Sequence, residues 1–99
     1  MDERNEMIGP IHPGEFLKDM LDEIEISAYA LANAIGKAPI QVTRILNGQA
    51  SITAPMARRI GKALGLTPEM LMNWQARYDL EVAETTEPEI KVTNLMAQA

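Results

Sequence analysis

The sequence predicts an all-α fold of five helices, followed by a possible short C-terminal strand or tail. Apolar residues recur at helical spacing in five separate stretches between residues 13 and 84. Proline or a small polar residue begins most of these stretches, and glycine ends several of them. We therefore divide the chain into a flexible lead-in over residues 1–10, a helical domain over 11–84 and a C-terminal extension over 85–99.

The first helix is expected over residues 13–24. Pro13 suits the first helical position, where the missing N–H of proline costs nothing. The apolar stripe that follows consists of Phe16, Leu17, Met20, Leu21 and Ile24. Four carboxylates and one lysine fill the opposite face and are expected to be solvated.

Two short helices come next. Ser27 is a good N-cap for a helix over residues 28–35, and Gly36 follows where a left-handed residue would end it. Pro39 begins another helix, which the Asn47-Gly48 pair ends. Together, residues 28–47 fit a helix-turn-helix arrangement. Its packing requires apolar side chains at four positions and a small one at a fifth, and the sequence supplies them as Leu31, Ile35, Val42, Ile45 and Ala32.

The last two helices have similar start and stop signals. Thr53 caps a fourth helix, which Gly65 ends, and Thr67-Pro68 starts a fifth that can reach residue 84. The stripe of the fifth helix is Leu71, Trp74, Tyr78 and Val82. Residues 89–95 then alternate apolar and polar side chains, so they form either a short strand or a loose tail.

Charge is distributed unevenly along the chain. Residues 1–25 carry eight acids and two bases, and residues 69–99 carry six acids and two bases. Residues 26–68, in contrast, carry five bases and no acid, although the whole chain has a net charge of −5. This layout predicts one positive surface on an acidic protein, which suits a polyanionic partner. The alternative is that small polar and apolar residues simply crowd charge out of this stretch.

Composition narrows the remaining possibilities. With 99 residues, of which 46% are hydrophobic, the chain fits one packed domain. It has no cysteine, no apolar run near the roughly 20 residues of a membrane span, and no signal-peptide pattern. We also find no nucleophile with a base, no glycine-rich phosphate loop and no metal-ligand spacing. We expect a soluble cytoplasmic protein that is not an enzyme, needs no cofactor and contacts no membrane.

Several segments resemble known proteins. Residues 26–48, ISAYALANAIGKAPIQVTRILNG, resemble the Xre-type helix-turn-helix of the λ-repressor and Cro superfamily. The segments IHPGEFL at 11–17, ITAPMARRIGKALG at 52–65 and TPEMLMNWQARYDLE at 67–81 are similar to the HigA antitoxin family, also called VapI. The resemblance implies a five-helix λ-repressor-like DNA-binding domain.

The same resemblance implies partners and functions. Members of the family neutralise a partner RNase toxin, repress their own toxin–antitoxin operon and bind palindromic operators as dimers. We therefore expect this chain to bind double-stranded DNA, a cognate toxin and a second copy of itself. A dimer would place two copies of the 39–47 helix roughly 34 Å apart, one DNA turn. Because late helices often form the dimer interface in this family, Trp74 and Tyr78 serve either the core or that interface.

Nine residues are expected to contact DNA, because they start the helix-turn-helix or lie on the outward side of its second helix. They are Ser27, Lys37, Ala38, Pro39, Ile40, Gln41, Thr43, Arg44 and Asn47. Arg44 can pair with guanine, bind a phosphate or remain a solvated surface residue. Gln41 can pair with adenine or a phosphate, and Ile40 can touch a thymine methyl group or simply be exposed.

The other expected contacts are mainly to phosphates. Thr43 and Lys37 suit phosphate oxygens, whereas Ser27 and Asn47 also have a plain role as helix caps. Two features depart from the Xre pattern. Ala28 stands where many members carry glutamine, and the second helix starts with Ala38-Pro39 instead of a polar cap.

Two alternatives stay open, and these departures motivate the first of them. The chain could be mainly a toxin-binding module with little DNA binding, its acidic ends gripping a basic toxin. It could also be a stand-alone Xre-type repressor without a toxin. Of the residues outside the motif, His12 is expected to cap or pack, and Arg58, Arg59 and Lys62 to neutralise a helix surface.

Overall fold

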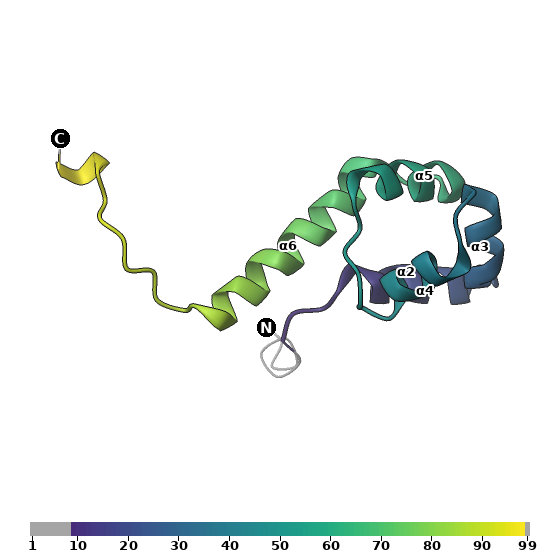
Figure 1. Ribbon diagram of the computed structural model, residues 1–99, viewed down its shortest axis with the longest axis horizontal. Coiled ribbons are helices and arrows are strands. Elements are labelled where there is room, and N and C mark those ends of the chain that lie inside the picture. The colour runs from purple at the N-terminus through teal and green to yellow at the C-terminus, as the bar shows by residue number, and fades with distance from the viewer. Residues whose placement is uncertain (1–8, 99) are drawn as a thin grey trace.

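The computed structural model describes residues 9–98, which form five α-helices and one short 3₁₀ helix (Figure 1). The α-helices are α2 (Pro13–Glu23), α3 (Ala28–Ile35), α4 (Pro39–Leu46), α5 (Ala54–Leu64) and α6 (Pro68–Thr86), and the 3₁₀ helix is η1 (Met96–Gln98). Most of the expected lead-in, residues 1–8, lies outside the described part. Residues 9–98 contain no strand, so the expected strand over 89–95 is absent and the alternative, a tail, is present.

Side-chain caps explain where the helices begin. The Ser27 Oγ accepts a hydrogen bond from the Ala30 N–H at 3.0 Å, and Thr67 Oγ1 accepts from the Met70 N–H at 3.1 Å. The Thr53 hydroxyl accepts in the same way at the start of α5. Each of these bonds satisfies one of the free N–H groups of a first helical turn. The predicted caps Ser27, Thr53 and Thr67 are therefore confirmed.

Left-handed glycines end two of the helices. Gly36 has φ +71° after α3, and Gly65 has φ +74° after α5. A side chain would strain the backbone in this conformation, so glycine is favoured at both positions. The tight turn at Gly36 directs α4 across α3, as the helix-turn-helix arrangement requires.

The core lies where the helical faces meet. Helix α3 packs on α4 and α5, α2 packs on α4 and α6, and α5 packs on α6. The side chains predicted to lock the helix-turn-helix are all buried, with Ala32 at 0% exposure and Val42 at 1%. The full set of buried apolar side chains is Leu17, Leu21, Leu31, Ala32, Ile35, Val42, Ile45, Leu46, Ile52, Met56, Ala57, Ile60 and Leu71.

Two predicted stripes are less buried than expected. On α2, Phe16 is 42% exposed and Ile24 is 49% exposed. Ile24 is the C-cap residue beyond the end of the helix, and Phe16 packs at the edge of the core, 5.3 Å from the Trp74 ring. On α6, Leu71 is fully buried but Val82 is 36% exposed. Helix α6 runs to Thr86, two residues beyond the expected limit, and its second half projects away from the body (Figure 1).

His12, just before α2, packs against α6. His12, which is 7% exposed, caps α2 by accepting from the Gly14 N–H at 2.8 Å. Its ring lies edge-on to Tyr78 at 4.9 Å. The expectation that His12 caps and packs is therefore confirmed.

Helix α2 lies very close to α4 at Gly14. A Cβ at Gly14 would overlap the carbonyl oxygen of Ile45, so α2 approaches α4 at a distance that only glycine allows.

No helix in residues 9–98 combines the length and the apolar character needed to cross a membrane.

Candidate nucleic-acid interface

Helix α4 has one buried and one exposed face. Val42, Ile45 and Leu46 point into the core, which fixes the rotation of the helix about its axis. This rotation leaves Gln41 and Arg44 exposed, together with Ile40 at 53% exposure. The exposed face therefore carries an amide, a guanidinium and an apolar side chain, which are groups that can meet base edges in a major groove.

No carboxylate neutralises this exposed face along its own segment. Residues 26–68 contain no Asp or Glu. Within residues 9–98, the ion pair formed is between Arg77 and Glu81 on α6, so Arg44 is not engaged in one. A guanidinium on a convex helix without a paired acid can bind a phosphate or a guanine bidentately.

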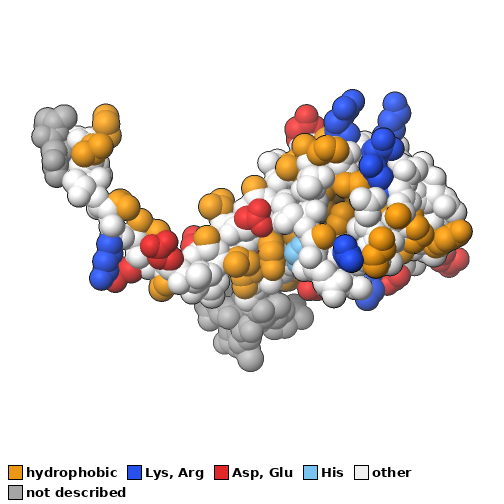
Figure 2. Space-filling model, in the orientation of Figure 1, with side chains coloured by type: hydrophobic (Ala, Val, Ile, Leu, Met, Phe, Trp, Pro, Cys, Tyr) orange, Lys and Arg blue, Asp and Glu red, His pale blue; other side chains and the backbone are white. Residues whose placement is uncertain are grey.

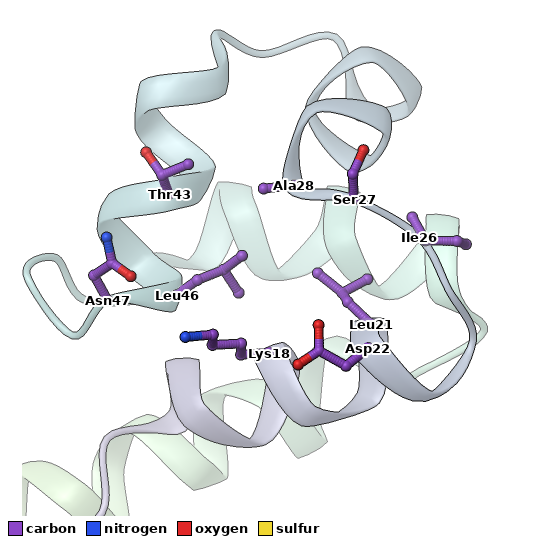
Figure 3. Close-up of a pocket in the computed structure, with 9 residues that line it drawn as sticks. All are labelled: Lys18, Leu21, Asp22, Ile26, Ser27, Ala28, Thr43, Leu46 and Asn47. Carbon is purple, nitrogen blue, oxygen red and sulfur yellow. The ribbon is translucent and has the colours of Figure 1, made fainter.

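Next to the exposed face, a hollow of about 230 Å³ opens between α2, α3 and α4. Figure 3 shows Thr43 and Asn47 on α4, Ser27 at the start of α3, and Lys18 and Asp22 on α2. Leu21 and Leu46 lie between these polar groups.

The hollow brings together three of the nine predicted residues, although 16 or more positions separate Ser27 from the other two. Ser27 and Ala28, at the start of α3, line it, and the N-terminal end of a helix favours anions. Asp22 is the carboxylate that lines this hollow.

Lys18 is a candidate site residue that the sequence analysis missed. It lies on the polar face of α2, and nothing in its position along the sequence distinguishes it from a solvated surface lysine. Only the packing of α2 against α4 brings it to the hollow that Ser27 and Asn47 line. Figure 3 shows its side chain directed toward the C-terminal end of α4, near Leu46 and Asn47, where the ammonium group adds a positive charge.

Ala28 explains part of the shape of this hollow. Its methyl group lies at the rim, between Ser27 and Thr43 in Figure 3. A longer polar side chain at this position would extend into the hollow. The departure from the Xre pattern therefore leaves an open space and one polar contact fewer.

The other predicted residues lie at the two ends of α4. Ala38 is the N-cap residue without a side-chain hydrogen bond, and Pro39 occupies the first helical position. Both are exposed, whereas Lys37 is half-buried in the turn, with its N–H donating to the Ala32 carbonyl at 3.0 Å. Asn47 is the C-cap residue, as expected. Thr43 is half-buried, and its hydroxyl donates to the Ile40 carbonyl at 3.1 Å, so a ligand must compete with this bond.

Arg59 has a structural role that the sequence analysis missed. Its Nη1 donates to the Ile35 carbonyl oxygen at 2.6 Å, at the C-terminal end of α3. A cation there satisfies a free carbonyl and interacts favourably with the negative end of the helix dipole. Arg59 therefore holds the turn of the helix-turn-helix. Together with Arg58 and Lys62, it also lines a groove between α3 and α5, here called the basic groove of α5. Figure 2 shows lysine and arginine side chains projecting from the surface over α5.

Gln75 is a second missed residue. It is 4% exposed on α6, and its Oε1 accepts a hydrogen bond from the Ile52 N–H at 2.8 Å. Its Nε2 donates to Asp79 Oδ1 at 2.9 Å. Gln75 therefore fixes the loop that follows α4. A helical spacing of four residues from the buried Leu71 was a signal that could have located it.

Among the described residues, no three His, Cys, Asp or Glu side chains gather as a metal site. The polar groups that come together at the hollow are the hydroxyls of Ser27 and Thr43, the Asn47 amide, the Lys18 ammonium and one carboxylate, Asp22.

Comparisons with known proteins identify the family and agree with the fold. Residues 17–71 match the family model described as helix-turn-helix. The antitoxin HigA-1 of Vibrio cholerae is 40% identical over 72 residues, which cover 72% of this chain and 68% of that protein.

Solved structures extend the similarity to most of the chain. An addiction module antidote protein of the HigA family from Coxiella burnetii has a TM-score of 0.79 and 39% identity, over 87% of this chain and 100% of that one. The antitoxin HigA of Pseudomonas aeruginosa, solved with the higBA promoter, has a TM-score of 0.78 and 37% identity, over 86% and 99% of the two chains. The chain therefore belongs to the HigA family of helix-turn-helix antitoxins.

Proposed function

We propose that this chain is a cytoplasmic antitoxin that binds a palindromic operator as a dimer, represses its own toxin–antitoxin operon and neutralises a partner RNase toxin. One observation carries the DNA half of the proposal: Gln41 and Arg44 stand exposed on α4, with no carboxylate along their segment. The P. aeruginosa HigA, which was solved with promoter DNA, supports it.

Each predicted residue has a role in this proposal. Arg44 reads guanine, Gln41 reads adenine and Ile40 touches a thymine methyl group. Ser27, Lys37, Thr43 and Asn47 hold phosphates, and Lys18 joins them across the hollow. Ala38 and Pro39 bring the start of α4 close to the DNA without reading bases.

The test of base reading is Arg44→Ala. Loss of a bidentate guanine contact costs about 1–3 kcal/mol, which is roughly a 5- to 150-fold loss of operator affinity. The discrimination against a duplex with the guanine replaced should fall equally. Fluorescence anisotropy with DNA from upstream of the coding region measures both quantities.

Arg58→Ala is the matched control, because Arg58 is exposed on α5 and lies outside the proposed interface. It should leave operator affinity within about twofold. An Arg44→Ala protein that binds the operator as tightly as the unaltered chain would contradict the proposed role of α4.

The antitoxin half rests on family membership, and its test is genetic. Expression of the adjacent open reading frame should arrest growth, and co-expression of this chain should restore it. If no neighbouring frame is toxic while the operator is still bound, the chain is a stand-alone repressor.

A second candidate function is a toxin-binding module with little affinity for DNA. It is favoured by Ala28, Ala38 and Pro39, which place no polar side chain where α3 and α4 begin. Under this reading, the chain co-purifies with the toxin, and neither Arg44→Ala nor raised salt changes a DNA signal that is already weak.

A further inference from the structure

A cleft beside α2 and α6 gathers most of the aromatic side chains of the chain. Its volume is about 430 Å³, and Phe16, Trp74 and Tyr78 are among the residues that line it. They are three of the four Phe, Trp and Tyr residues in the sequence. The Phe16 and Trp74 rings lie 5.3 Å apart and are inclined at 58° to each other. This cleft, here called the aromatic cleft, therefore has walls made largely of rings.

The core alone does not account for these rings. Leu17 on α2 and Leu71 on α6 fill the core at 0% exposure. Phe16, in contrast, is 42% exposed, and Trp74 and Tyr78 are half-buried. Aromatic side chains are enriched in the interfaces through which proteins bind one another. The aromatic cleft therefore offers a binding surface in addition to the packing of its rings.

A carboxylate completes the aromatic cleft. Glu81 lines it one turn beyond Arg77, and the Arg77 Nε lies 3.6 Å from Glu81 Oε2. The Arg77 side chain is 82% exposed, and surface ion pairs of this kind are weak. A cation from another molecule can therefore take the place of Arg77 beside Glu81. Aromatic faces and a carboxylate are together the groups that hold guanidinium and ammonium groups.

The two helices that form the cleft favour a cation over an anion. Helices α2 and α6 together carry eight acids and two bases, whereas residues 26–68, which include α4 and α5, carry five bases and no acid. A polyanion is therefore attracted to the α4 side and repelled from the cleft. A second copy of this chain, with its net charge of −5, is also less complementary to the cleft than a basic protein is.

We propose that the aromatic cleft binds an arginine side chain of a basic partner protein, whose guanidinium group stacks on the rings and pairs with Glu81. Arginine suits the cleft better than lysine, because its planar group can stack on an aromatic ring and bind a carboxylate through two N–H groups. The proposal deepens the proposed function by naming the surface that holds the partner toxin, and it rests on that function.

The fluorescence of one residue makes the cleft directly observable. Because Trp74 is the only tryptophan in the chain, its emission reports on the aromatic cleft alone. The probe is Nα-acetyl-arginine methyl amide, and its control is the citrulline analogue, which has nearly the same shape but no charge. The arginine probe should change the emission saturably at millimolar concentrations, whereas the citrulline analogue should not.

Three variants test the groups of the cleft with the same probe. Glu81→Gln should weaken binding of the probe about fivefold, because the carboxylate is lost while the side chain keeps its size. Arg77→Ala should tighten binding about twofold, because it removes the competing guanidinium group. Glu69→Gln is the matched control, since it removes one exposed carboxylate from α6 outside the cleft and should leave binding unchanged. Thermal melts check that all three variants remain folded.

A second measurement uses the product of the adjacent open reading frame. In isothermal titration, Glu81→Gln should lower the affinity of the chain for this protein at least about tenfold, as expected for a central arginine contact. The operator affinity of the same variant should not change, because no residue of α4 lines the aromatic cleft.

Three outcomes would overturn the proposal: equal responses to the arginine and citrulline probes, unchanged affinity of Glu81→Gln for the probe or for the toxin, or Trp74 emission that changes only with the concentration of the chain itself. The last outcome would assign the cleft to a second copy. The probe measurements contain neither toxin nor DNA, so they test the cleft even if no adjacent frame is toxic. A Glu81→Gln chain that binds and neutralises the toxin with full affinity would refute the cleft and leave the proposed function standing.

Discussion

The helical body and the C-terminal tail use the same kinds of side chain in opposite ways. In the body, Leu17, Ala57 and Leu71 are fully buried. In the tail, Ile90, Val92 and Leu95 are each more than 60% exposed. The body buries these side chains against its own helices, whereas the described chain buries none of the apolar side chains of residues 87–97. Apolar patterning alone therefore does not distinguish a core segment from an exposed one.

Helix α4 lies between these extremes. Its apolar side is buried in the body as firmly as any core helix, and its polar side is left for a partner. The rigid attachment of α4 matters for recognition, because side chains read bases only when their backbone is held in place. Gln75 bonds Ile52 in the loop after α4, and Arg59 bonds Ile35 at the end of α3, so these two bonds hold the segments on either side of α4.

The largest predicted difference in stability is between isoleucine-to-alanine substitutions in the body and in the tail. Ile60 is 1% exposed in the core, and Ile60→Ala should lower the free energy of unfolding by about 2–5 kcal/mol. Ile90→Ala is the matched change in the tail. It should alter the value by less than about 0.5 kcal/mol at protein concentrations too low for dimerisation. Urea unfolding of both variants measures the difference. Equal losses of unfolding free energy would contradict the distinction between a packed body and an unpacked tail.

A smaller effect is expected where α6 holds the loop after α4. Gln75→Leu leaves the Ile52 N–H without its buried partner, which costs about 1–3 kcal/mol of unfolding free energy. Because the loop loses its anchor, operator affinity should fall as well. The neighbouring exposed Asn73 serves as control, and Asn73→Leu should change neither quantity. Thermal melts together with DNA titrations check this prediction, and an unchanged melting temperature for Gln75→Leu would refute it.

The smallest effect is expected at the hollow beside α4. If Lys18 neutralises one phosphate, Lys18→Ala should reduce the slope of log affinity against log salt by about 0.9. Affinity should weaken uniformly over different DNA sequences, because phosphates carry no base identity. Lys62→Ala, on the basic groove of α5, should keep the original slope. Equal slopes for the unaltered chain and Lys18→Ala would remove Lys18 from the interface.

Much of the fold was predictable because its signals are local. The capping residues Ser27, Thr53 and Thr67 act within three positions, and the left-handed Gly36 and Gly65 end their own helices. The spacing of apolar residues then gave the buried faces of α3 and α4. Such rules work on a sequence because cause and effect lie within one turn.

The contacts that could not be predicted from the sequence join residues that lie far apart along the chain. Gln75 bonds Ile52 across 23 positions, and Arg59 bonds Ile35 across 24. The spacing of Gln75 from Leu71 indicates that it is buried, but no local pattern identifies Ile52 or Ile35 as the residue to which each side chain bonds. The same is true of Lys18, which reaches the hollow only through the packing of α2 on α4. The contact of the nine residues with DNA remains a prediction. Three of the nine line one hollow, and three more share the exposed side of α4.

The most direct test compares binding of the chain to its own upstream DNA and to a shuffled duplex of the same composition, over a range of salt. We expect the upstream DNA to be bound at least about 10³-fold more tightly, with an affinity that falls steeply as salt rises. Equal affinity for both duplexes, or no binding even at low salt, would contradict the proposal that the exposed side of α4 reads operator DNA.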